Sequence, residues 1–332
     1  MAGVRALRKL QFGREVTAGT GVVATSIWRG KGVISDDHET VFVEADEGIL
    51  GGTNRAYKPK LAATLNLEEI EATYEQLPHL LEMGIKSVGT GAADGAGTDK
   101  IYSYPLSTTA INTLKSYTIE GGDNEEAERM EYCLASKITL KGKGGEAVMM
   151  GAEIFGRQVA LQAFTGSLAL ATVETIIFGG GKLYIDAIGG TIGTTLQSNT
   201  LLEMGLEINT GVVPVWTIDN KYFSLHKIAN PEVVLTLTFE HDTVSKAEKV
   251  KWRAGTSSLI QLKFEGSNVA TPGTTYSKKT LLANLAGQWE KFAALGDQDG
   301  NDVLTGTFRS KYDVTAARWF DLVVVNELAS IP

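Results

Sequence analysis

Apolar and polar residues alternate with a period of two along most of the chain. Between positions 130 and 141 one face carries Met130, Tyr132, Leu134, Ile138 and Leu140. The other face carries Glu131, Lys137, Thr139 and Lys141, and segments 232–240 and 260–265 repeat the pattern. Such alternation is typical of antiparallel strands with one face on a core and one facing water or a partner. The chain is therefore expected to be mainly β.

The same reading places further strands along the rest of the sequence, separated by turn signals. The expected strands are 40–46, 57–67, 115–120, 146–155, 182–187, 200–209, 279–291, 303–310 and 319–327. Gly121-Gly122, Gly142 to Gly145 and Asp299-Gly300-Asn301 mark tight turns between them.

Only two segments have the pattern of helices. The first covers about 74–83, with Thr73-x-x-Gln76 as a capping pattern and Gly84 at its end. Because Pro78 lies inside it, its regular part is expected to start one turn late. The second covers about 246–254, opened by Ser245-x-x-Glu248 and closed by Gly255.

The segments around these two helices resemble each other at an offset of 172 residues. Pro59 then corresponds to Pro231, and the alternating residues from Leu61 to Leu67 correspond to those from Val233 to Phe239. The caps Thr73 and Ser245 fall in the same register. Alternating strands resemble one another easily, so coincidence is the competing explanation, but the matching caps and prolines favour an internal duplication.

The duplication predicts two tandem β-sandwich or barrel domains, each with one flanking helix. The first is expected over 1–175, with an N-terminal arm and an inserted loop at 85–114, and the second over 176–332. The inserted loop contains a glycine-rich run from Gly89 to Gly97.

Composition narrows the possible functions. The 332 residues carry 31 Lys and Arg against 39 Asp and Glu, a net charge of −8, with one cysteine, Cys133, and four histidines. A net acidic chain lacks the cationic surplus that grips nucleic acid. One cysteine forms no internal disulfide and no cysteine-built zinc site. The sequence shows no secretory signal and no apolar run long enough for a membrane helix.

Motifs that carry enzymatic chemistry are missing from the sequence. Gly179-Gly-Gly-Lys182 lacks the spacing of a phosphate-binding loop, and the glycines from Gly189 to Gly193 open no helix. The segment 297–302 resembles a calcium loop, but its glycine stands at the fourth position rather than the sixth, so we interpret it as a hairpin turn. Cys133 alternates onto the polar face of its strand and is interpreted as structural. We therefore expect no enzyme, no catalytic, cofactor or metal site, and no cofactor.

Three segments carry a resemblance to a known family. They are Gly296-Asp-Gln-Asp-Gly-Asn-Asp302 with Thr307-Phe-Arg-Ser-Lys-Tyr-Asp313, Phe320-Asp-Leu-Val-Val-Val-Asn-Glu-Leu328, and Phe12-Gly-Arg-Glu-Val-Thr-Ala-Gly-Thr20 followed by Trp28-Arg-Gly30. With them the chain resembles the tail tube, or major tail, proteins of long-tailed bacteriophages. These are turn and strand patterns rather than catalytic signatures.

The resemblance implies a structural virion protein, assembled in the host cytoplasm. In that family six β domains form a ring around a lumen, and the rings stack along a tape measure protein between tail terminator and baseplate proteins. DNA passes through the lumen without specific binding, and no part inserts into a membrane. Because this chain supplies two domains, the expected ring contains three chains.

Two assignments remain open at this point. The N-terminal arm 1–20 and the insertion 85–114 are candidates for contacts between rings, or simply a mobile terminus and a surface loop. The alternative function is a β-rich baseplate or receptor-contacting module, which would display aromatic residues on loops. The five tryptophans (Trp28, Trp216, Trp252, Trp289 and Trp319) are instead expected in or beside strands and the second helix, which favours packing.

Overall fold

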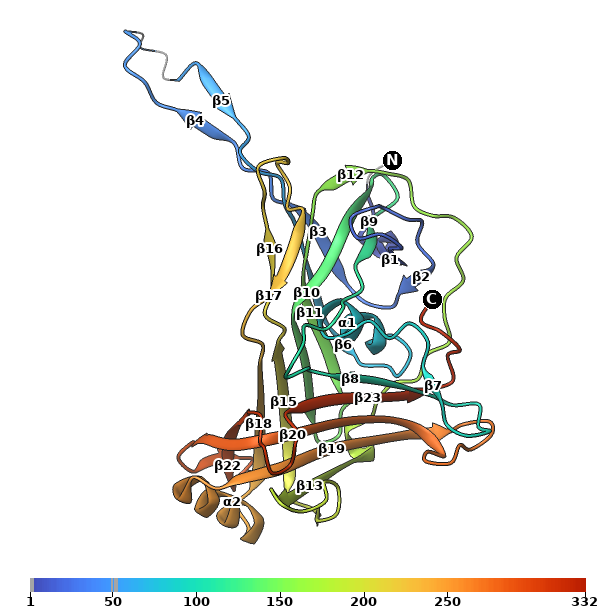
Figure 1. Ribbon diagram of the computed structural model, residues 1–332, viewed down its shortest axis with the longest axis vertical. Coiled ribbons are helices and arrows are strands. Elements are labelled where there is room, and N and C mark those ends of the chain that lie inside the picture. The colour runs from blue at the N-terminus through green and yellow to red at the C-terminus, as the bar shows by residue number, and fades with distance from the viewer. Residues whose placement is uncertain (1–2, 49, 51–52) are drawn as a thin grey trace.

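The computed structural model describes residues 3–48, 50 and 53–332 and consists mainly of antiparallel strands (Figure 1). The mainly β fold expected from the alternation is confirmed. The strands expected from the sequence are present, with ends displaced by a few residues, and all five tryptophans lie in or beside strands or in the second helix.

A continuous sheet of eight hydrogen-bonded strands, here called the central sheet, runs through the molecule. Its spatial order is β3 (Gly32–Asp36), β6 (Ala63–Glu71), β11 (Met149–Gly156), β10 (Ala127–Lys143), β15 (Leu201–Asn209), β18 (Glu232–Glu240), β22 (Asn301–Ser310) and β20 (Lys278–Phe292). The first four strands come from residues before 176 and the last four from residues after it. We call these parts of the chain the first half and the second half.

Side-chain alternation gives the central sheet one buried face and one polar face. In β18 the residues Val233, Leu235, Leu237 and Phe239 are buried, while those between them are partly exposed. In β6 the residues Ala63, Leu65 and Leu67 are buried between exposed polar neighbours. Both helices and the two outer sheets described next pack on the buried side, where one hydrophobic core spans the two halves.

Each half adds an outer sheet, and one long strand in each half belongs to both its sheets. The first outer sheet has the order β2 (Ser26–Trp28), β1 (Lys9–Arg14), β9 (Tyr117–Gly122), β10 and β12 (Val159–Leu161). The second has the order β14 (Leu196–Gln197), β13 (Gly181–Ala187), β19 (Ser257–Asn268), β20, β23 (Phe320–Asn326), β8 (Lys100–Pro105) and β7 (Ala92–Ala93). A β-bulge marks the crossing in both long strands, between Ala135 and Lys137 in β10 and between Trp289 and Lys291 in β20.

Helix α1 (Leu77–Gly84) is buried along its whole length. It starts one turn after residue 74, as Pro78 required, because a proline at the first helical positions loses no backbone hydrogen bond. Its sequence is apolar except for His79 and Glu82, which is why both of its sides are covered.

Helix α2 (Thr243–Ala254) buries only one side, at Ser245 and Glu248. The expected cap at Ser245 is wrong by one turn. Asp242 is the N-cap, and Ser245 is the reciprocal residue of the capping box. Gly255 ends the helix in the left-handed conformation, with φ of 65°. Neither helix is long and apolar enough to cross a membrane in the described part of the chain.

The placement of Cys133 on a polar strand face is also wrong, because its side chain is fully buried. A bulge between Met130 and Cys133 puts Tyr132 at φ 55° and reverses the alternation there. The thiol donates to the carbonyl of Met130 at 3.2 Å, and burial raises its pKa well above the usual value. The Cys133 side chain therefore lies in the core, on the opposite face of the strand from the one expected.

The insertion 85–114 and the N-terminal arm are packed against the rest of the chain. Strand β8 of the insertion pairs with β23 of the second half, and Asp94 accepts backbone hydrogen bonds from Thr275 and Tyr276. In the N-terminal segment, β1 lies between β2 and β9. Strands β1 and β8 are therefore paired within the chain, whereas residues 3–9 of the arm are exposed.

Two hairpins instead extend from the central sheet, one from each half. β4 (Val41–Val43) and β5 (Arg55–Tyr57) connect β3 to β6, and β16 (Val212–Val215) and β17 (Leu225–Ile228) connect β15 to β18. The first hairpin projects away from the body of the molecule, whereas the second lies along it (Figure 1).

Candidate assembly interface

The two halves join through the pairing of β10 with β15, here called the seam. Its register runs from Lys137 opposite Asn209 to Lys143 opposite Glu203. Ile138 and Ile208 are fully buried on its inner face, with Leu140 and Leu206 beside them. The seam therefore combines a continuous backbone ladder with buried apolar cross-strand pairs.

Ion pairs cross the seam on its polar face. The Lys137 ammonium lies 3.0 Å from the Glu207 carboxylate, and that of Lys143 lies 3.2 Å from Glu203. All four side chains are partly exposed, so each pair contributes at most about 1 kcal/mol to stability. Opposite charges in register nevertheless favour this alignment over a slipped one.

Charges elsewhere on the polar face are paired in the same way. Lys141 contacts Glu69 across β11, and Arg309 pairs with Glu232 and Glu290 on its two neighbouring strands. Threonine hydroxyls fill positions between them, as where Thr238 and Thr305 lie 3.0 Å apart. The face is thus polar and dense in charge, and Lys137, Lys141 and Lys143 on it already have carboxylate partners.

The strand order of the central sheet repeats with the chain. When the two halves are aligned on their bulges at Ala135 and Trp289, the strands of the first half match those of the second half one by one. The matching pairs are β3 with β15, β6 with β18, β11 with β22 and β10 with β20. The outer sheets follow, since β2-β1-β9 matches β14-β13-β19. The seam therefore joins the last strand of one four-strand unit to the first strand of the next.

This structural register differs slightly from the offset of 172 expected over the helix region. Leu65 corresponds to Leu235 and Thr73 to Asp242, since these residues hold the same places in the ladders and caps. A slip of two residues along a strand keeps every apolar side chain on the same face, so the alternation alone does not detect it.

Both ends of the central sheet carry edges without a strand partner among the described residues, although at the β20 edge the Glu290 carbonyl accepts a hydrogen bond from the Trp252 indole at 3.0 Å. In the part of the chain that the structure describes, β3 pairs only with β6, and β20 beyond Gln288 pairs only with β22. Val33 on β3 is 58% exposed, and Ile34 beside it is buried. An open edge with an apolar neighbour readily pairs with another strand.

The hairpin β16–β17 covers the first half through a small apolar cluster. Val212 and Phe223 pack on Tyr132 and Leu134, with the rings of Tyr132 and Phe223 4.8 Å apart. The matching hairpin β4–β5 has no such cover, and its Phe42 and Tyr57 are 65% and 54% exposed. Its two strands therefore present an uncovered apolar surface.

The segments considered for chemistry in the sequence are turns or core positions. Asp186 in β13 accepts backbone hydrogen bonds from Gly193, Thr194 and Thr195 of the loop that follows the strand. Residues 299–300 form the tight turn expected between β21 (Gly296–Gln298) and β22, both with positive φ. The described residues contain no cluster of three or more potential metal ligands.

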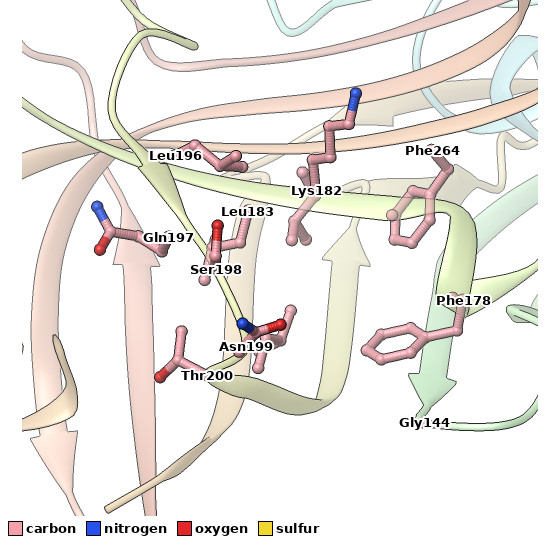
Figure 2. A pocket seen from close by; sticks show the side chains of 14 residues that line it. Gly144, Phe178, Lys182, Leu183, Leu196, Gln197, Ser198, Asn199, Thr200 and Phe264 are labelled. Carbon is pink, nitrogen blue, oxygen red and sulfur yellow. The ribbon is translucent and has the colours of Figure 1, made fainter. Parts of the chain in front are cut away.

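A hollow of about 380 Å³ lies at the glycine segment 179–182, since Gly179, Gly181 and Lys182 line it together with Gly144 from the end of the seam. Figure 2 shows Phe178, Leu183 and Phe264 lining it together with polar residues of the segment 197–200. Lys182 at its rim pairs with Glu265, and Lys263 contacts the same carboxylate. The two ammonium groups, with Lys263 contributing most, lower the Glu265 pKa to about 2. No convergent acid–base pair faces this hollow.

A buried polar network under α1 has no obvious signal in the sequence. Glu82 is fully buried and accepts hydrogen bonds from Arg14, from the Tyr117 hydroxyl and from the amides of Val88 and Gly89. The only hint is one glutamate inside an apolar helix. With every partner supplied by the chain itself, the network is structural.

Comparison with known proteins leaves the family open: no protein-family model matches the chain, and no characterised protein matches it in sequence.

Proposed function

We propose that this chain is the subunit of a bacteriophage tail tube, and that three chains close a ring of six four-strand units. The observation that carries the proposal is the seam. Inside one chain the last strand of a four-strand unit, β10, pairs with the first strand of the next, β15. At the two open edges, β20 is again the last strand of a four-strand unit and β3 is again the first. The pairing seen at the seam is therefore available between β20 of one chain and β3 of the next.

The register that this pairing would take can be derived from the seam. In the repeat, Lys291 is equivalent to Lys137 and Asp37 is equivalent to Asn209. The same register would therefore place Lys291 of one chain opposite Asp37 of the next, with opposite charges. Phe292, the last residue of β20, then lies opposite Asp36 of the next chain, at the start of the pairing. Repeating one head-to-tail edge contact gives a closed ring when the rotation between chains divides a full turn. The number of six units comes from the resemblance to tail tube proteins.

The polar face of the central sheet supports its assignment to the lumen. DNA slides past a wall most easily when no free cation holds its phosphates. Lys137, Lys141 and Lys143 of this face are paired with glutamates, and threonines lie between the pairs. Such a wall is polar enough for water and offers little net attraction for DNA.

Cryo-electron microscopy of purified protein, or of tails containing it, tests the proposal. The expected result is a tube of stacked rings with three chains each and with β20 beside β3 of the neighbour. Rings of six chains would contradict the stoichiometry. A monomer at every concentration would favour the alternative, a baseplate or receptor-contacting module.

A further inference from the structure

The tip of the first half's hairpin β10–β11 lies against the second half inside the chain. The amide of Gly144 donates to the carbonyl of Leu202 at 3.0 Å, and the amide of Phe178 donates to the carbonyl of Glu146 at 3.1 Å. Lys143 at the start of this turn pairs with Glu203. Gly144 and Phe178 meet at the hollow in Figure 2, so the turn seals the outer end of the seam.

The equivalent turn of the second half, 297–302, has no backbone contact with a neighbouring four-strand unit within the described chain, and its Gln298 amide donates to the Glu203 carboxylate of its own half at 3.5 Å. It joins β21 to β22, and Gly300 at its tip has φ 88°, close to the 85° of Gly145 in the first turn. Its three carboxylates, Asp297, Asp299 and Asp302, are exposed. None of the three forms an ion pair with a described residue, so this acidic turn is left without a counter-charge within the described chain.

The surface equivalent to the supporting one lies at the N-terminus of the chain. The single-turn helix η1 (Arg5–Leu7) precedes β1 as η2 (Phe178–Gly180) precedes β13, and Lys31 occupies the place of Glu203 at the start of its strand. A groove of about 250 Å³ opens there beside the free edge of β3. Its charged lining residues are Arg5, Arg8, Lys9, Lys31 and one carboxylate, Glu68.

Most of the positive side chains in this groove are free to bind an acidic partner. Lys9 stacks over the ring of Phe164, but Arg5, Arg8 and Lys31 are exposed and form no ion pair with the described residues. A second hollow on the other side of Arg8 is lined by Asp123, Glu126 and Glu128, which would repel an acidic ligand. The basic groove is therefore bounded, and it faces the edge where the next chain is expected.

We propose that the acidic turn 297–302 of one chain binds in the basic groove of the next chain; this rests on the ring described above. The charges are then the reverse of those at the internal seam. At the internal seam the turn carries the positive Lys143 and the receiving strand carries the negative Glu203. Between chains the turn would carry the aspartates and the receiving groove would carry the arginines and lysines.

Reversed charges would give the assembly its direction. An acidic turn placed on the internal receiving site would meet Glu203, and a turn carrying Lys143 placed in the basic groove would meet Lys31. Like charges brought together in this way disfavour the wrong partner. The contact between chains therefore selects the second half of one chain for the first half of another.

Charge reversal on each side tests the contact. Asp297→Lys with Asp299→Lys reverses the turn, and Arg8→Glu with Lys31→Glu reverses the groove. Each double variant is expected to raise the critical concentration for assembly at least about tenfold at low salt. The matched control for the groove variant is Lys246→Glu with Arg253→Glu on α2, which lowers the net charge by the same amount and should assemble like the wild type.

A variant with all four substitutions distinguishes a lost contact from a folding defect, because only a lost contact would be repaired by the second charge reversal. The quadruple variant restores opposite charges at every contact and is expected to assemble within about threefold of the wild type. A mixture of the two double variants can satisfy its contacts only by alternating, which a ring of three does not allow, so it should fail to close rings.

The outcomes separate this inference from the proposed function. If the wild type forms rings and both double variants assemble equally well, the docking of the turn is wrong and the ring stands. Failure of the quadruple variant to recover, with its unfolding transition unchanged, would also overturn the docking. If the wild type forms no ring at all, the proposed function fails and this contact with it.

Discussion

Thr73 and Asp242 occupy the same position in the two halves of the chain. The Thr73 hydroxyl accepts a hydrogen bond from the backbone amide of Gln76 at 3.1 Å, and the Asp242 carboxylate accepts one from the backbone amide of Ser245 at 2.8 Å. Both residues follow the second strand of their four-strand unit and open the turn into its helix. The two caps lie 169 residues apart, close to the 170 residues between the matching strand positions Leu65 and Leu235 and below the offset of 172 that the alternation favoured.

Removing the charge of Glu82 should strongly destabilise the chain. Glu82→Gln leaves the partly buried Arg14 without its carboxylate and replaces one acceptor of the Val88 and Gly89 amides with an NH₂ group. We expect a loss of about 3 kcal/mol in the free energy of unfolding, measured by urea denaturation. Glu69→Gln breaks the exposed pair with Lys141 and serves as the control, with an expected loss below about 1 kcal/mol. Equal effects would contradict the role given to burial.

Stability should fall on acidification because of His79. Burial lowers its pKa to about 4, against an ordinary value of 6.5, so the folded chain keeps it neutral while the unfolded chain binds a proton. Stability is then complete above pH 6.5 and decreases by up to about 1.4 kcal/mol per pH unit down to pH 4.

Urea midpoints across that range measure the effect of His79. His79→Phe keeps a ring against Phe12 and should flatten the slope between pH 6.5 and 4.5. The Glu265 carboxylate, whose pKa is about 2, loses its contribution only as the pH falls below its ordinary value of 4.5. A slope unchanged in the variant above pH 4.5 would assign the acid sensitivity to other groups.

Freeing the lysines of the polar face should slow DNA passage. In Glu203→Gln with Glu207→Gln, Lys143 and Lys137 lose their carboxylate partners and can bind phosphates instead. We expect slower DNA ejection from assembled particles at low salt and recovery at high salt, because phosphate contacts weaken as salt rises. Lys137→Gln with Lys143→Gln is the matched control. Normal ejection by the glutamine-for-glutamate variant at low salt would argue against a lumen-facing position for this sheet.

The exposed hairpin β4–β5 should act after ring closure. Phe42→Ser with Tyr57→Ser removes its two largest exposed aromatic side chains without touching the core, so the fold should be retained. If the hairpin reaches the adjacent ring, rings form but stack into tubes more slowly, as seen by light scattering and negative-stain microscopy. Tubes of normal rate and length would exclude these side chains from stacking.

The sequence by itself determined the fold class, most strand positions and the two helices. Alternation in 232–240 and the capping residues around 242–255 are local signals, and local signals are what a sequence displays directly. The tight turn at 299–300 was equally clear, because it needs residues that accept positive φ.

Only the tertiary structure decided which strands meet and which segments are covered. The pairing of β10 with β15, and of β8 with β23, joins residues far apart in the chain through backbone groups that every residue carries. No side-chain pattern specifies such partners, and a bulge at Tyr132 was enough to turn Cys133 inward. The free edges of β3 and β20, and the charges beside them, follow from that pairing and not from periodicity.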